Sequence, residues 1–116
     1  MSRPEPRGTR VSNRVPAVIF AALGDPTRLS LLTRLTDGEP RSISALATGT
    51  GLTRQAVTKH LRVLERAGLV ASGRVGRESH FAFRPEPLSA ARAYLDRVAA
   101  QWDDVLGRIK AAVEER

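Results

Sequence analysis

The chain of 116 residues contains no cysteine, which excludes disulfide bonds, zinc sites with cysteine ligands and thiol-based redox sensing. It has no apolar run of about 18 residues, so no membrane-spanning helix is predicted. The N-terminal segment lacks an apolar stretch before a small-residue cleavage site, and no secretion signal is predicted. These absences favour a cytoplasmic protein with one small domain.

Groups suited to catalysis are also scarce. The chain has only two histidines, and no serine or acidic residue lies in a recognisable catalytic setting. For His60 we expect packing or a phosphate contact, and for His80 a surface position. The sequence therefore predicts no enzyme activity, no catalytic residues and no cofactor.

The net charge of +7 is concentrated in two segments. Residues 54–84 carry seven basic residues against two glutamates, and residues 1–14 carry four arginines against one glutamate. Residues 15–53 are balanced, and residues 85–116 carry a net charge of −1. Such clustering is typical of a protein that binds a polyanion, whereas a merely solvated basic surface would spread the charge.

The segment that starts at Thr53 has the pattern of a DNA-recognition helix. Thr53 is a favourable N-cap, and Gly68 is a favourable residue to end the helix. Val57, Leu61 and Leu64 recur at a spacing that places them on one buried face. The residues left on the outer face are Arg54, Gln55, Thr58, Lys59 and Arg62. Arginine and lysine donate to guanine edges in the major groove, and glutamine pairs with adenine.

Two helices are predicted before this one. The first covers the apolar run 15–23, and the second begins at Asp25 and Pro26. Aspartate is a good N-cap, and proline is favoured at the first helical position. The buried stripe of the second helix is expected at Leu29, Leu32 and Leu35. Arg28 is expected to pair locally with Asp25, a phosphate contact being the alternative.

A short helix from Ala45 to about Thr48, capped by Ser44, follows a brief strand or lead-in at 42–44. A turn with two glycines joins it to the recognition helix, which is the arrangement of a helix-turn-helix. These glycines do not form a phosphate-binding loop, because the preceding apolar strand and the Lys-Ser/Thr ending are missing.

The residues after the recognition helix form a predicted β-hairpin. Phe81 and Phe83 alternate with other residues, as in a half-buried strand, and we interpret both as core rather than as RNA-stacking groups. Arg74 and Arg77 flank Gly76 at the hairpin tip. A hairpin in this place is a wing, whose arginines follow the DNA backbone or enter the minor groove.

The C-terminal segment, residues 85–116, carries an unbroken heptad stripe. Its apolar positions are Leu88, Ala91, Leu95, Val98, Trp102, Val105, Ile109 and Ala112. The remaining domain is too small to cover a stripe of this length. We therefore predict a dimerisation helix with Trp102 near the centre of the interface; the alternative is a helix that folds back on its own domain.

The chain is thus divided into a disordered basic arm (1–14), a winged helix-turn-helix domain (15–84) and a dimerisation helix (85–116). The arm is rich in proline and arginine and has little to bury. It serves either as a mobile tail or as an extension into the minor groove.

Several of these motifs occur together in one known family. The segment Phe20–Leu29, the segments Thr58–Leu64 and Ala67–Val70, and the Gly76-Arg77 wing resemble ArsR/SmtB-type winged-helix repressors. The resemblance spans roughly residues 15–110. It implies a mainly α fold of five helices with a small β-hairpin wing, in a homodimeric bacterial repressor that binds an inverted-repeat operator.

The resemblance also assigns roles to residues. It implies base contacts from Arg54, Gln55, Thr58 and Lys59. Backbone contacts are predicted for Ser44, Thr53, Arg62, Arg74 and Arg77. The expected partners are double-stranded DNA and a second copy of the chain.

The metal sensors of this family use cysteines before the recognition helix, or histidines and carboxylates on the last helix. Here residues 44–48 contain no thiol, and the last helix contains no histidine. No metal site is predicted, and no effector is assigned. The competing hypothesis is a winged-helix module that binds proteins without specific DNA binding; the basic excess at 54–84 favours DNA.

Overall fold

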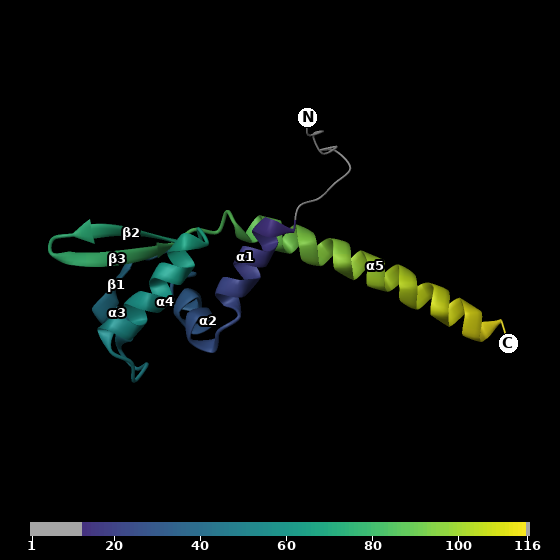
Figure 1. Ribbon diagram of the computed structural model, residues 1–116, viewed down its shortest axis with the longest axis horizontal. Helices are drawn as coiled ribbons and strands as arrows, with labels where there is room; N and C mark the ends of the chain where they lie inside the picture. Colours follow the sequence, from purple (N-terminus) through teal and green to yellow (C-terminus); the bar gives the residue numbers. More distant parts are fainter. Residues whose placement is uncertain (1–12, 116) are drawn as a thin grey trace, which may run out of the picture.

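The structure is a computed structural model that describes residues 13–115, with five helices and three strands in that range (Figure 1). In chain order they are α1 (Arg14–Leu23), α2 (Pro26–Thr33), β1 (Arg41–Ser42), α3 (Ile43–Ala47), α4 (Arg54–Arg66), β2 (Val70–Val75), β3 (Glu78–Phe83) and α5 (Leu88–Glu114). The mainly helical fold class with a β wing is confirmed. Of the predicted arm, residues 1–12 lie outside the described range, and Arg14 belongs to α1.

The first two helices meet at the predicted turn. The Asp25 carboxylate accepts a hydrogen bond from the Arg28 backbone N–H at 3.0 Å, and Pro26 occupies the first helical position. Within residues 13–115 no single helix is long and apolar enough to cross a membrane. Only α1 and α2 together reach that length and composition, and they are bent by 93° relative to each other.

The buried face of α2 differs from the prediction at one position. Leu32 and Leu35 are buried as expected, but Leu29 is 50% exposed and Leu31 is only 1% exposed. The helix ends at Thr33, so Leu35 enters the core from the following turn. Because α2 ends before Leu35, the intervals of three residues between Leu29, Leu32 and Leu35 do not define one buried helical face. The prediction that Leu29 is buried was wrong.

The short helix α3 begins two residues earlier than predicted. Its N-cap is Ser42, whose hydroxyl oxygen accepts a hydrogen bond from the Ala45 backbone N–H at 3.0 Å, so the capping role predicted for Ser44 was wrong. Ser42 is fixed by pairing with His80 in the sheet, and the end of that strand sets the start of the helix. Ser44 instead lies exposed in the first turn.

The wing is a sheet of three antiparallel strands in the order β1-β3-β2, rather than a simple hairpin. Arg41 of β1 pairs with Phe81, and Val70 of β2 pairs with Phe83. The brief strand that was one of two alternatives at 42–44 is present as β1, one residue earlier, but a strand of two residues carries no readable periodicity, so its pairing with β3 was not predicted. Phe81 is fully buried and Phe83 packs against the core, as predicted.

Helix α4 crosses the centre of the domain and contributes the middle of the core. Val57, Leu61 and Leu64 are fully buried, as their spacing predicted. At its end Gly68 has a φ of 80°, and the Leu69 backbone N–H donates to the Leu64 carbonyl at 3.0 Å. This packing fixes one face of α4 in the domain and leaves the opposite face to solvent.

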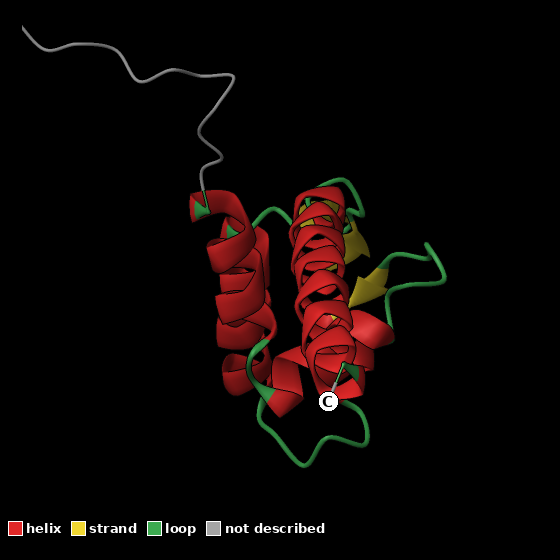
Figure 2. Cartoon of the chain, turned by 90° about the vertical axis from the view of Figure 1, so that its right-hand side faces the viewer, coloured by secondary structure: helices red, strands yellow, loops and turns green. Residues whose placement is uncertain are grey.

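Helix α5 leaves the domain as a single rod of 27 residues, about 40 Å long at the usual helical rise (Figure 1). Its first turns pack on α1, the helix that follows the grey trace in Figure 2. Phe20 and Tyr94 meet there edge to face, with ring centroids 5.8 Å apart. The remainder projects away from the other elements.

Candidate nucleic-acid interface

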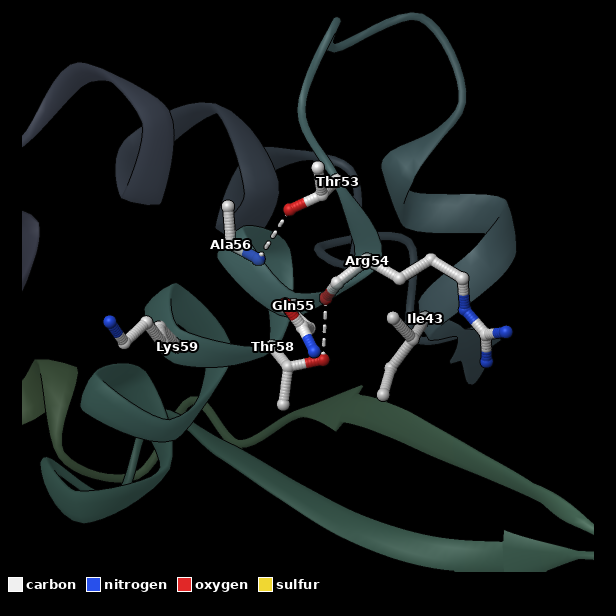
Figure 3. A pocket seen from close by; sticks show the side chains of 7 residues that line it. All are labelled: Ile43, Thr53, Arg54, Gln55, Ala56, Thr58 and Lys59. Atoms are coloured by element: carbon white, nitrogen blue, oxygen red, sulfur yellow. Dashed lines mark hydrogen bonds between the residues drawn. The ribbon is translucent and has the colours of Figure 1, made fainter.

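The first turns of α4 present an exposed polar face. The Thr53 hydroxyl oxygen accepts a hydrogen bond from the Ala56 backbone N–H at 3.0 Å, so the predicted N-cap is confirmed (Figure 3). Arg54, Gln55 and Lys59 are exposed, and their side chains make no hydrogen bond or ion pair with any residue from 13 to 115. Their donors and acceptors are therefore free for an external partner.

Thr58 lies on the same face but is already hydrogen-bonded. Its hydroxyl donates to the Arg54 carbonyl at 2.7 Å, one helical turn earlier (Figure 3). This bond occupies the hydroxyl proton, so the side chain offers its methyl group and only the accepting capacity of its oxygen to the outside.

An open groove of about 770 Å³ runs beside this face, lined mostly by apolar surface (Figure 3). Its lining residues are Ile43, Thr53, Arg54, Gln55, Ala56, Thr58 and Lys59. Ile43 comes from α3 and was not predicted, because only the tertiary contact between α3 and α4 brings it here.

The wing tip carries two exposed arginines, as predicted. Gly76 takes a φ of 62° in the turn, a conformation that favours glycine. The Arg74 guanidinium makes a long contact of 3.4 Å with the Arg77 carbonyl, and the Arg77 side chain makes no hydrogen bond or ion pair within the described residues. Both cationic groups are thus available at the tip.

Arg62, for which a contact to the DNA backbone is predicted, also makes contacts within the protein, and its side chain stays 43% exposed. Its guanidinium donates to Glu65 at 2.7 Å and lies over the Phe81 ring, 5.3 Å from the centroid. The Ser72 hydroxyl donates to the other Glu65 oxygen at 2.6 Å. This network joins the end of α4 to strand β2, and we assign Arg62 to holding the wing against the recognition helix.

Replacing Glu65 by glutamine is expected to lower the free energy of unfolding at pH 7 by about 1 kcal/mol, the usual net value of such a hydrogen bond. The Ser72 hydroxyl and the Arg62 guanidinium hold the pKa of Glu65 below its ordinary value. A lowered pKa stabilises the fold above the unfolded-state pKa, and this contribution disappears as the pH falls through the folded-state pKa.

The difference between wild type and Glu65→Gln should therefore shrink below about pH 4, near the ordinary glutamate pKa. Chemical denaturation at neutral and acidic pH measures it. A difference of equal size at both pH values would show that the charge of Glu65 does not stabilise the fold.

A second network holds the recognition helix from the opposite side. The Arg28 guanidinium donates to the Ala22 carbonyl at 2.7 Å, at the end of α1, and lies 3.3 Å from the His60 ring nitrogen Nδ1. The Asp25 carboxylate accepts a hydrogen bond from the Arg28 backbone N–H and not from the Arg28 guanidinium. The predicted ion pair between the two side chains is therefore not the main contact of Arg28. His60 thus makes polar contacts within the protein, to Arg28 and, at 3.9 Å, to the Asp25 carboxylate, which is neither of its two predicted roles.

An apolar surface runs along the projecting part of the last helix. This α5 stripe consists of Leu95, Val98, Trp102, Val105, Leu106, Ile109 and Val113. Trp102, at its centre, is 59% exposed. Leu106 and Val113 widen the predicted heptad pattern.

Two residues predicted for the dimer interface lie in the domain core instead. Ala91 is only 5% exposed, and Leu88 packs against the core cluster. Both belong to the turns of α5 that lie on α1, so they are already covered within one chain. They are excluded from the α5 stripe.

Known proteins share this arrangement. A helix-turn-helix domain model matches residues 23–72. The HTH-type transcriptional regulator YuzN of Bacillus subtilis is 42% identical over 76 residues, which are 60% of this chain and 83% of YuzN. An ArsR-like transcriptional regulator from Rhodococcus sp. RHA1 is 42% identical with a TM-score of 0.69, covering 84% of this chain and 91% of that chain.

The chain belongs to the ArsR family of transcriptional regulators. As an ArsR-family regulator it binds DNA through its winged helix-turn-helix, and its class is not enzymatic. A further solved relative is the homodimeric winged helix-turn-helix DNA-binding domain of Mb0332 from Mycobacterium bovis. It is 27% identical with a TM-score of 0.63, covering 87% of this chain and 92% of that chain.

The charged residues of this ArsR-family chain do not gather into a metal-binding cluster in the described range. No group of three or more histidine, aspartate or glutamate side chains within residues 13–115 is placed to hold a metal ion.

Proposed function

We propose that this ArsR-family chain is a repressor that binds a palindromic operator in the bacterial cytoplasm as a homodimer. The observation that supports it most is the exposed start of α4, where Arg54, Gln55 and Lys59 have no partner among residues 13–115. Leaving such groups unpaired suits a helix that enters the major groove and pairs with base edges there. A repressor then blocks transcription by occupying the operator.

The proposed contacts fall into two groups. Base contacts are assigned to Arg54, Gln55, Thr58 and Lys59. Contacts to the sugar-phosphate backbone are assigned to Ser44, Thr53, Arg62, Arg74 and Arg77. Ser44 and Thr53 lie exposed in or beside the first turns of α3 and α4, and the last two arginines lie at the wing tip.

Dimerisation is supported by the α5 stripe, which one chain leaves uncovered. On α1, Val15 and Val18 are also about half exposed. They line an apolar groove of about 570 Å³ together with Pro87 and Ala90. Apolar patches of this kind are typical of interfaces. The solved relative Mb0332 is described as homodimeric, and we extend that state to this chain.

This gives residues 15–84 the DNA-reading role and residues 85–116 the dimerising role. The boundary between these two segments is not sharp, because Leu88 and Ala91 of the second segment pack in the core formed by residues 15–84. Two-fold symmetry would place two copies of α4 about 34 Å apart, one helical turn of DNA.

The test is a titration of the purified protein against DNA upstream of its own gene, at two salt concentrations, with random DNA as competitor. We expect binding that survives the competitor and weakens steeply with salt. Binding no tighter than to random DNA, for this fragment and for fragments selected from the whole genome, would contradict the proposal. It would favour a module that binds protein partners.

Replacing Arg74 and Arg77 together by alanine is expected to flatten the salt dependence of operator binding. Each phosphate contact contributes about 0.9 to the slope of log K against log salt, so two contacts per chain contribute about 3.6 in a dimer. Titrations over a range of salt concentrations measure the slope. Arg92→Ala is the matched control, since Arg92 is exposed on α5. An unchanged slope in the double variant would show that the wing does not reach the DNA.

A further inference from the structure

The DNA-facing groove contains apolar surface that the polar base contacts do not use. Ile43 is the first residue of α3 and is half-buried, and the part of its side chain that is not packed on the core lines this groove (Figure 3). The groove lies between the first turns of α3 and α4. Contact between this apolar side chain and an apolar group of a bound ligand would remove apolar surface from water and so favour binding.

Thr58 adds a second apolar group to the same groove. Because its hydroxyl proton is directed to the Arg54 carbonyl at 2.7 Å, its methyl group points away from that carbonyl (Figure 3). The hydrogen bond also restricts the rotamer, so the methyl is held in place. Ile43 and Thr58 thus line one groove from two different helices.

We propose that Ile43 and the Thr58 methyl form a subsite for the 5-methyl group of a thymine. Thymine is the only base with a methyl group at its major-groove edge. The inference rests on the proposed function, because it requires α4 to lie in the major groove. It specifies the base contact assigned to Thr58 as one made by its methyl group.

The neighbouring side chains support this choice of ligand. Arg54 and Gln55 line the same groove and carry free polar groups. They can therefore pair with adjacent base edges while the thymine methyl covers the apolar surface of Ile43 and Thr58. A cytosine at this position carries only a hydrogen at C5, so its contact with Ile43 and the Thr58 methyl would be lost, and its C4 amino group would replace the thymine O4 acceptor. The groove is therefore a specificity determinant as well as a contact.

The test replaces each thymine of the selected operator by uracil, which removes only the methyl group. We expect one symmetry-related position at which the replacement weakens binding about fourfold per half-site, the value for burying one methyl group. Replacement at thymines outside the contacted positions should change affinity less. A scan of a specifically bound operator in which no thymine shows this loss overturns the inference.

Two variants of Thr58 separate its methyl from its hydroxyl. Thr58→Val keeps a methyl group and removes the hydroxyl, so the ratio of thymine to uracil affinity should stay near fourfold. Thr58→Ser keeps the hydroxyl and removes the methyl, so the ratio should fall to about twofold or less. The opposite pattern would show that the hydroxyl does the reading and would overturn the inference.

Ile43→Ala should also reduce the ratio of the affinity for the thymine operator to that for the uracil operator, and Ile43→Val should preserve most of this ratio. Circular dichroism and thermal unfolding establish that each variant is folded before its ratio is compared. Leu29→Ala is a matched control, because Leu29 is an exposed aliphatic residue of α2 outside this groove and should keep the full ratio. An Ile43→Ala protein that is folded and keeps the full ratio contradicts the proposed subsite.

Failure of this inference can be distinguished from failure of the proposed function. If the protein binds its operator far better than random DNA but is indifferent to uracil at every position, only the thymine subsite is wrong. If random DNA competes equally at every salt concentration, specific DNA reading is wrong and the subsite falls with it.

Discussion

Replacing Trp102 by glutamate is expected to convert the dimer into a monomer and to weaken operator binding by a factor of about 10²–10⁴, the range that linking two binding modules provides. Trp102 is 59% exposed in the single chain and lies at the centre of the α5 stripe. A carboxylate there would have to be buried without a partner in the dimer, which is strongly unfavourable. Sedimentation equilibrium gives the oligomeric state, and a DNA titration gives the affinity.

The variant should leave the winged domain folded, because the Trp102 side chain lies outside the core of one chain. Ala100→Glu is the matched control: it adds the same charge on α5, on the face turned away from the stripe. We expect it to remain a dimer. A Trp102→Glu protein that stays dimeric and keeps its operator affinity would exclude the α5 stripe as the interface.

The second large effect is expected for Gln55→Ala. On the correct operator this change should cost about 1–3 kcal/mol per half-site, and it should relax the preference at one base position. The physical reason is that a glutamine amide can donate to and accept from an adenine at once. Because Gln55 is exposed and makes no hydrogen bond within residues 13–115, its truncation removes no interaction that stabilises the fold.

The measurement compares wild type and variant on the operator, on its single-base variants and on random DNA. Affinity for random DNA serves as the control and should hardly change, since phosphate contacts dominate it. An equal loss on all sequences would mean that Gln55 positions the protein on the backbone and does not read a base.

Local sequence signals were sufficient for the elements that define the fold. Asp25 with Pro26 and Thr53 mark helix starts through backbone hydrogen bonds made within a few residues. The spacing of Val57, Leu61 and Leu64 identified the buried face of α4, because a 13-residue helix gives its period clearly. The basic, exposed face of α4 followed from these assignments.

Features that depend on tertiary contacts were not predictable in this way. The Arg62 guanidinium lies over the Phe81 ring on strand β3, and no local pattern reports that contact, whereas its ion pair with Glu65 has the local i,i+3 spacing of a helix. Ile43 reaches the groove only because α3 packs against α4. Leu31 replaces Leu29 in the core because the short helix α2 ends before its period is established.

In the proposed dimer, two recognition helices read two half-sites on one face of the DNA. An insertion of about five base pairs, half a helical turn, between the half-sites of the selected operator would place them on opposite faces. We expect the affinity of the protein for this operator to fall to that for a single half-site, a loss by a factor of about 10²–10⁴. Unchanged affinity after the insertion would contradict a symmetric dimer on a palindromic operator.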